Sequence, residues 1–414
     1  MHDSMNTQQD TSNSVLGTTP ARESVGASPG LTLFFIAMGL FGMFTVEFSV
    51  VGVMPMIVER YGVSIAEAGM LVSIFAAVLA LFGPVMVLWL SSYESKKVLV
   101  LSLGVFSVCS ILSAWAPNFA TLMALRLPSA LMLSAFFSVA FVTAVSLYPP
   151  EQAARASSMA IMGESAGLVF GAPVITLIAS TISYEASFYF CAAVCGAAAL
   201  GLQLARLPEV RSRSPRITSS FRILRDSSFW MAITFSVLAF AAIYSVYSYT
   251  VEYLSSEGFR GEKASLVMVL FGIGGLIGTY LAGRLLTYSV RIALMVYPVL
   301  MGLSYLLLSF TNQPSLGVMA ALCLVWGAVQ MGLVVATQFL VTTAGKEAPQ
   351  FATSLFVSSA NIGITAGAAI AGLWITTAGV EGAFSVGWVF CAAALIAIGA
   401  VLPILRRNGQ MKNW

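Results

Sequence analysis

Residues 31–58 read LTLFFIAMGLFGMFTVEFSVVGVMPMIV, an apolar run that contains a single charged residue, Glu47. As an α-helix, a run of this length would extend for about 40 Å at about 1.5 Å per residue. A bilayer-spanning helix needs about 20 predominantly apolar residues, whereas a core helix of a soluble protein rarely keeps such a run. The stretch therefore predicts a transmembrane helix close to the start of the chain.

The composition of the whole chain supports a membrane location. Of 414 residues, 58% are hydrophobic and only 9% are charged, and the mean hydropathy is +0.91. Soluble proteins carry about 25% charged residues, so this chain has too little polar surface to remain soluble. The net charge of +3 is too small to indicate a nucleic-acid-binding protein. We interpret the sequence as that of an integral membrane protein.

Eleven further apolar runs follow the first, each ending at charged residues, Pro or Gly. None shows the segments of about ten alternating residues that are typical of a transmembrane β-barrel. Twelve transmembrane helices are therefore predicted, in an all-α integral membrane protein. After 31–58, the predicted spans are 67–91, 97–116, 119–147, 154–180, 185–206, 227–253, 264–287, 291–310, 315–343, 351–375 and 383–405.

The distribution of basic residues predicts the orientation of the chain. If the N-terminus is cytoplasmic, sixteen of the 20 Lys and Arg residues lie on the cytoplasmic side, and Arg126 lies inside a predicted helix. The opposite side then holds Arg60, Arg260 and Lys263. Such a bias follows the positive-inside rule and indicates that both termini are cytoplasmic.

One long connection divides the helical part into two halves. Residues 207–226 are rich in Arg and Ser and fall between the sixth and seventh predicted helices. They predict a cytoplasmic linker between a bundle at 31–206 and a bundle at 227–405. Residues 1–30 lack an apolar run and predict a disordered cytoplasmic tail, and 406–414 predict a second cytoplasmic tail.

The two halves resemble each other in sequence. The fifth helix contains MGESAGLVFGAPV (162–174) and the eleventh contains SSANIGITAGAAI (358–370), so that two glycines align in each. Weak internal symmetry of this kind is typical of transporters built from two repeated bundles around a binding site at the membrane midplane. We therefore expect two pseudo-symmetric six-helix bundles.

Several stretches resemble the major facilitator superfamily, and most closely its bacterial drug and sugar efflux branch. The resemblance as a whole covers nearly all of residues 40–400. The stretches are FTVEFSVVGVMP (44–55), LMALRLPSALM (122–132), the fifth-helix residues Gly163, Gly171 and Pro173, YSYTVEYL (247–254), LFGIGGLIGTYLAGRL (270–285) and SSANIGITAGAAIAGLW (358–374). The resemblance implies the major facilitator fold, a multi-pass location in a bacterial inner membrane, and proton antiport driven by a proton gradient without a cofactor.

The chain departs from the family pattern in the loop after the second helix. In VLWLSSYESKK (87–97), Ser92 occupies the position of the family's Asp, while Lys96 and Lys97 are retained. In the matching loop of the second half, Thr287 stands at the Asp position and Arg291 follows. Because the family's Asp helps to hold the cytoplasmic side shut, we expect a weaker cytoplasmic gate formed by Ser92, Lys96, Lys97 and Arg291.

Three charged residues lie well inside predicted spans: Glu47, Arg126 and Glu164. A charge near the bilayer centre costs at least about 2.5–3.5 kcal/mol, which marks it as a candidate functional residue. Burial favours a neutral carboxyl group and a nearby guanidinium favours the charged form. We predict that Glu47 carries the proton, that it can form an ion pair with Arg126, and that Glu164 contributes. The alternatives are a static structural pair or a carboxylate that binds a cationic substrate.

Polar and aromatic residues of the second half are candidates for the substrate-binding wall. Buried amides need partners, either another helix or a ligand. Taken singly, each side chain is also explained by packing; taken together, they suggest a cavity for a partly polar or aromatic solute. The candidates are Tyr244, Tyr247, Trp326, Gln330, Gln338 and Asn361.

Small residues recur at four-residue spacing in the fifth and eleventh helices. This spacing allows two helix backbones to approach closely in lipid. We expect close packing at the interface of the two halves, where these positions would act as pivots; simple helix packing is the alternative. The residues are Gly163, Gly167, Gly171, Pro173, Gly363 and Gly367.

Other classes of function find no support in the sequence. The only histidine, His2, precedes the first span, all five cysteines fall within predicted spans, and GIGGLIG (272–278) lacks the Lys of a nucleotide-binding loop. We therefore expect no enzyme, no metal site and no nucleic-acid partner. The prediction is a monomeric, proton-coupled exporter of a small organic compound, such as a drug, sugar, nucleoside or metabolite. The alternatives are an uptake symporter or facilitator and, less favoured, a non-transporting receptor or scaffold.

Overall fold

The computed structural model describes residues 29–90, 93–148, 153–205, 207, 225–311, 314–346 and 349–407. Within this part of the chain, twelve helices or helix pairs are long and apolar enough to cross a membrane, which confirms the predicted number of spans. Most of the predicted linker 207–226 and nearly all of the two predicted tails, 1–30 and 406–414, lie outside the described residues.

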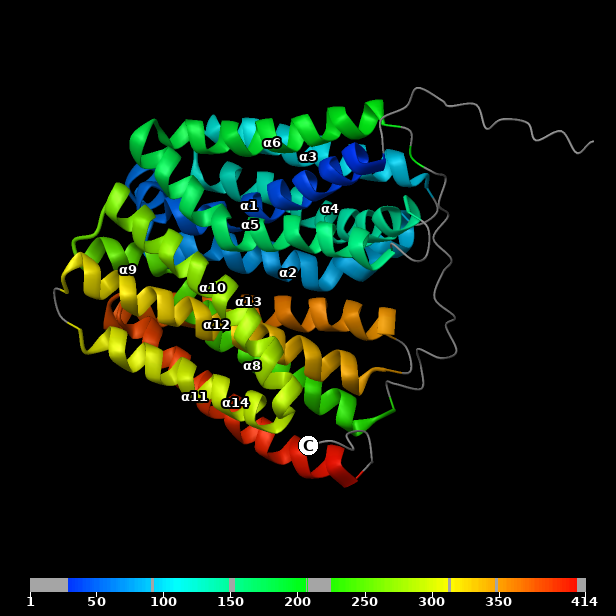
Figure 1. Cartoon of the computed structure of the whole chain (residues 1–414). Coiled ribbons are helices and arrows are strands. Elements are labelled where there is room, and N and C mark those ends of the chain that lie inside the picture. The colour runs from blue at the N-terminus through cyan, green and yellow to red at the C-terminus, as the bar shows by residue number, and fades with distance from the viewer. Residues whose placement is uncertain are drawn as a thin grey trace, which may run out of the picture.

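The helices form two groups that follow the two halves of the sequence (Figure 1). In Figure 1 the first group is the upper one and the second group the lower one. The first group comprises α1 (Pro29–Tyr61), α2 (Ile65–Leu90), α3 (Ser95–Ala114), α4 (Phe119–Ser146), α5 (Ala153–Thr181) and α6 (Tyr184–Leu204). The second comprises α8 (Ser227–Tyr247), α9 (Thr250–Ser256), α10 (Glu262–Tyr288), α11 (Val290–Ser309), α12 (Leu316–Ala344), α13 (Pro349–Ala378) and α14 (Gly382–Arg407).

Local sequence explains where several of these helices begin and end. The side chains of Asn118, Ser183 and Ser315 accept hydrogen bonds from backbone N–H groups three residues ahead, which caps α4, α6 and α12. Gly62 and Gly379 end α1 and α13 with φ values of 60° and 71°, a conformation that a side chain disfavours. These capping and turn residues explain why the predicted boundaries agree closely with the structure.

The seventh predicted helix, 227–253, is not continuous. It divides at Ser248 and Tyr249 into α8 and the short α9, although the two together form one span. The hydroxyl of Tyr249 donates a hydrogen bond to the backbone oxygen of Ala368 in α13, at 2.7 Å. The Tyr249 ring lies against Gly69 of α2 and Gly372 of α13, where a Cβ atom would collide with it. The predicted span is therefore present, but its helix is interrupted at this point.

The two halves are joined near one end of the molecule. We call the end at which α6 stops and α8 starts the linker end, and the other the far end. Ser265 Oγ of α10 donates to the backbone oxygen of Pro173 in α5 at 3.1 Å, and Thr365 Oγ1 of α13 lies 3.3 Å from the backbone oxygen of Ser73 in α2. Ser265, Pro173 and Ser73 all belong to the far-end parts of their helices. The structure is therefore closed at the far end.

Candidate functional site

Glycines of α5 determine how closely α1 approaches in the first half. A Cβ atom on Gly167 would lie 2.7 Å from the backbone oxygen of Phe41, and one on Gly171 would lie 2.9 Å from Thr45 Cα. Gly163 makes the same kind of contact with Ala37. Because these α1 contacts are four residues apart, the two backbones stay in contact along two helical turns.

The second half repeats this arrangement between α13 and α8. Gly363 lies against Val237 and Gly367 against Ala241, again with a spacing of four residues. The expected internal symmetry is thus present in the packing. The expectation that these glycines lie between the halves is wrong, because both sets pack within their own half. Pro173 does lie between the halves, since its backbone oxygen accepts the hydrogen bond from Ser265.

The α1–α5 contact positions Glu47 two residues after Thr45. The Glu47 side chain is buried, with 7% of its surface exposed. Its Oε2 atom has no hydrogen-bond partner among the described residues. An unpartnered carboxylate oxygen in an apolar environment strongly disfavours the charged form. Glu47 is therefore a buried acid whose charge state depends on what else can reach it.

Arg126 of α4 does not bind the Glu47 carboxylate in this structure. Its Nη2 donates to the backbone oxygen of Glu47 at 2.7 Å and its Nη1 lies 3.4 Å from the backbone oxygen of Val46. The guanidinium also lies 4.9 Å from the centre of the Phe75 ring, a cation–π contact. The predicted ion pair is thus replaced by an anchor from α4 to the backbone of α1, because the arginine satisfies helix carbonyls instead.

A small void borders Arg126. The void measures about 10 Å³ and is lined in part by Ser49, Ser110, Ser113 and Ser129. Neither Arg126 Nε nor Ser110 Oγ has a hydrogen-bond partner among the described residues. Both polar groups therefore border the void without a protein partner among the described residues.

Phe48, the neighbour of Glu47, connects α1 with the second half. Its ring stacks on Tyr244 of α8 at a centroid distance of 5.7 Å and meets Tyr247 edge-on at 6.0 Å. Both tyrosines were predicted as binding residues, whereas Phe48 was not. The only sequence signal for Phe48 is its position directly after the buried acid.

The aromatic contacts continue from Tyr247 through the second half. Tyr247 stacks on Phe271 of α10 at 5.5 Å, and Phe271 meets Trp326 of α12 at 4.8 Å. Trp326 in turn lies 6.1 Å from Tyr305 of α11. Five helices therefore contribute to one aromatic cluster beside Glu47, which we define as Phe48, Tyr244, Tyr247, Phe271, Trp326 and Tyr305. The sequence missed Phe271 and Tyr305, which lie in apolar runs without a distinguishing pattern.

Two of the three predicted amides are buried with unused acceptors. Gln330, one turn after Trp326, and Asn361 are each 5% exposed. Gln330 Oε1 and Asn361 Oδ1 have no hydrogen-bond partner among the described residues. The third amide, Gln338, is exposed, so the expectation that it is buried is wrong. Its side chain lies two turns beyond Gln330 on α12, towards the linker end.

Glu164 is half-buried on α5, adjacent to Gly163. No hydrogen bond or ion pair joins it to another described residue. It lies directly after Gly163 and three residues before Gly167, two of the glycines that contact α1. Its predicted contribution to proton coupling stays a prediction.

Among the described residues of the predicted cytoplasmic gate, Lys96 and Lys97 bind partners in their own half. Lys96 Nζ donates to the backbone oxygen of Ala205, just past the end of α6, at 2.9 Å. Lys97 pairs with Glu94 at 3.1 Å on the surface. Both contacts lie within the first half, and Arg291 of the second half is exposed. Ser92 lies outside the described residues.

Comparison with known proteins identifies what this arrangement resembles. The sequence model described as Major Facilitator Superfamily matches residues 35–348. The chain is 30% identical to the "Inner membrane transport protein YdhP" of Escherichia coli (strain K12), over 83% of this chain and 88% of that one. It is 26% identical to the "Chloramphenicol resistance protein" of Streptomyces lividans, over 89% and 95%.

Solved structures share the fold. A bacterial homolog of the human lysosomal transporter Spinster, in an inward-facing and occupied conformation, matches with a TM-score of 0.73. The two chains are 16% identical, and the match covers 90% of this chain and 96% of the other. At this identity the likeness extends to the fold alone.

Proposed function

The chain belongs to the major facilitator superfamily, and from this membership we propose that it exports a small organic compound across the bacterial inner membrane in exchange for protons. Members of this family are transporters and not enzymes. Two observations support export: a relative is named as a chloramphenicol resistance protein, and another, of Mycobacterium tuberculosis, as a chloramphenicol efflux pump. The fifth-helix Gly-x-Pro of the efflux branch, Gly171 and Pro173, points in the same direction.

The observation that carries the proposal is the position of Glu47. Its carboxyl group is buried, has an unpartnered oxygen, and belongs to the residue before Phe48, which contacts the other half. When the halves separate at the far end, the contact between Phe48 and Tyr244 must change. That change would alter the access of water to Glu47 and hence its affinity for a proton.

Arg126 contributes by positioning Glu47. Its two hydrogen bonds to α1 keep the Glu47 backbone at a constant distance from α4. The carboxyl group can then rotate towards or away from the guanidinium while the backbone stays in place. In the proposed cycle, Glu47 releases its proton when it lies near Arg126 and binds one when it does not.

The aromatic cluster and the two buried amides suggest the substrate class. Flat aromatic rings offer stacking surfaces, and Gln330 and Asn361 offer hydrogen-bond acceptors. The set suits an uncharged or weakly polar organic molecule with a ring and a few hydroxyl or amide groups. Drugs, sugars and nucleosides fall into this class.

Uptake by proton symport is the second candidate function. A buried carboxyl group can couple a proton to movement in either direction, so Glu47 does not distinguish the two. A receptor or scaffold on the same fold needs no protonatable group in its core, and Glu47 counts against it. The direction in which the solute moves relative to the protons separates all three functions, because a receptor or scaffold moves no solute.

The test is transport by the purified protein in liposomes with an imposed pH gradient. Chloramphenicol, a disaccharide and a nucleoside are offered as labelled solutes, and proton movement is followed with an internal pH dye. Antiport predicts that solute and protons move in opposite directions and that Glu47→Gln abolishes the stimulation by the gradient. Glu59→Gln, which alters an exposed carboxylate on the same helix, is the matched control. Flux in Glu47→Gln that follows the gradient as in the unaltered protein would overturn the assignment of Glu47.

A further inference from the structure

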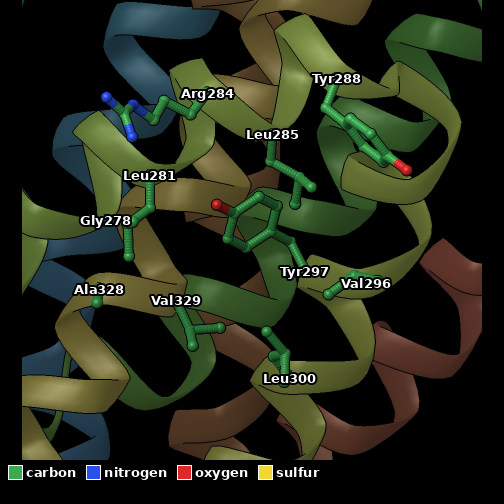
Figure 2. A pocket seen from close by; sticks show the side chains of 10 residues that line it. All are labelled: Gly278, Leu281, Arg284, Leu285, Tyr288, Val296, Tyr297, Leu300, Ala328 and Val329. Atoms are coloured by element: carbon green, nitrogen blue, oxygen red, sulfur yellow. The ribbon is translucent and has the colours of Figure 1, made fainter.

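A groove of about 460 Å³ lies on the second half, away from Glu47 and the aromatic cluster (Figure 2). It is bordered by α10, α11 and α12. Its lining is aliphatic except for Arg284, Tyr288 and Tyr297. None of these three residues takes part in the site described above.

The groove opens to the surroundings of the membrane-spanning helices. Leu281 of α10 and Leu300 of α11, which line it, are 50% and 37% exposed. Both helices are long and apolar enough to span a bilayer, so their exposed apolar side chains face lipid tails. A hollow in such a surface is filled by a lipid chain, because water has no hydrogen-bond partners there.

Along the helix axis, the groove covers the depth of a lipid headgroup and of the first part of its acyl chains. It extends along α10 from Gly278 to Tyr288, the last residue of that helix, a length of about 15 Å at about 1.5 Å per residue. Arg284 is one turn from the helix end, and a long arginine side chain reaches from there to the headgroup level. Figure 2 shows its guanidinium turned outward at the rim. The aliphatic part of the groove lies deeper, at the level of the acyl chains.

The charge around the groove calls for an anionic partner. Between residues 264 and 346 the sequence contains no Asp or Glu, while Arg284, Arg291 and Lys346 all fall near the linker end. Arg284 is exposed, lies 5.1 Å from the centre of the Tyr280 ring, and forms no ion pair with a described residue. A phosphate group complements this cationic rim.

Tyr297 supplies a second polar group inside the groove. The residue is 5% exposed and belongs to the lining of the groove. Its ring is held against α12 at Gly332, where a Cβ atom would collide with it. In Figure 2 the hydroxyl points across the groove towards Leu281. A hydroxyl held in this way can donate to the ester carbonyl of a lipid.

We propose that this groove binds one anionic phospholipid of the surrounding bilayer. The headgroup phosphate binds Arg284, a glycerol ester oxygen accepts from Tyr297, and an acyl chain lies between α10, α11 and α12. This proposal does not rest on the proposed proton-coupled export. Its test measures lipid binding and not transport. A phospholipid in this position would fill the space between α11 and the neighbouring helices α10 and α12.

The experiment measures which lipids stay bound to the full-length protein. The protein is purified in detergent, incubated with equal amounts of phosphatidylglycerol and phosphatidylcholine, and analysed by native mass spectrometry. We expect one phosphatidylglycerol to be retained, and Arg284→Gln to lower its preference over phosphatidylcholine about tenfold, the factor that one charge-assisted hydrogen bond supplies. Arg284→Lys should keep most of the preference, and Arg225→Gln, at an exposed arginine on the same end, should keep all of it.

The aliphatic part of the groove is tested by filling it. Val296→Trp places a large side chain in the groove and should abolish retention of either lipid, whereas Val299→Trp, on the exposed face of the same helix, should not. The thermal unfolding midpoint of each variant shows that it is folded. Equal lipid retention in Val296→Trp and Val299→Trp would overturn the proposal. So would displacement of the lipid by inorganic phosphate alone, or occupation of the groove by a second copy of the chain.

Discussion

The Nη2 atom of Arg126 lies 2.7 Å from the backbone oxygen of Glu47, and the carboxylate of the same residue is not paired with it. The buried arginine therefore binds the main chain of Glu47 and leaves its carboxyl group outside these hydrogen bonds. This division separates two roles that a simple ion pair would combine. It also means that substitutions at the two positions should have different effects.

Arg126→Lys should lower stability as well as transport. A lysine ammonium lacks the planar fork that reaches Val46 and Glu47 at once, so at least one contact to α1 is lost. We expect a loss of about 1–3 kcal/mol, typical of a buried hydrogen bond to a charged group. Thermal unfolding in detergent measures this, with Arg225→Lys as the control. An unchanged unfolding midpoint would contradict the anchoring role.

Glu47→Gln should separate exchange from coupling. The amide is close in size to the carboxyl group but cannot carry a proton, so the halves can still move with substrate bound. We expect substrate exchange between the two sides of a liposome to persist at equal pH on both sides, while accumulation driven by a pH gradient is lost. If both activities disappear together, Glu47 is required for substrate binding and not for coupling alone.

Gly171→Val should disrupt the packing of α5 on α1. The added Cβ would lie 2.9 Å from Thr45 Cα, which cannot move without shifting the helix. Overpacking of this kind costs about 1–3 kcal/mol, and it should also displace Glu47, two residues from Thr45. Gly104→Val in α3 is the matched control, because no atom lies within 4 Å of the position of its Cβ. Equal unfolding midpoints for the two variants would count against the close contact.

Phe48→Leu and Tyr244→Leu should interact energetically. The two rings stack across the halves at 5.7 Å, and an aromatic pair is worth about 0.5–1.5 kcal/mol beyond the area it buries. A double-mutant cycle on the thermal stability of this far-end-closed state should return a coupling in that range. The same cycle with Phe48 and Tyr253, which lies against Phe384 instead, should return almost none. Additive effects for Phe48 and Tyr244 would show that the stacking contributes nothing.

Much of the architecture follows from patterns that depend on neighbouring residues alone. Apolar runs gave the helices, and caps such as Asn118 and Ser183 sit where the runs begin. The glycine repeats predicted close helix packing, but the partner helix could not be read from them. Spacing shows that Gly171 meets a backbone, and only the tertiary fold shows that this backbone is α1.

The remaining differences arise from side-chain geometry. The positions of Glu47 and Arg126 along their helices are compatible with an ion pair, but the arginine rotamer directs its donors to the α1 carbonyls. Gln338 continues the pattern of Gln330 in sequence, yet it falls on the exposed face of α12. The break at Tyr249 has no Pro or Gly to announce it. It coincides with the hydrogen bond from the Tyr249 hydroxyl to α13.

The same tyrosine governs how the far end can part. Its hydrogen bond to Ala368 joins two helices of the second half, while its ring rests on Gly69 of the first. When the halves separate, the ring leaves with its own half, and no hydrogen bond of Tyr249 needs to break. The contact with Gly69 is surface against surface, so it can re-form in each transport cycle at little cost. A side chain at position 69 would collide with the Tyr249 ring, so either the tyrosine or α2 would have to shift before the far end could close.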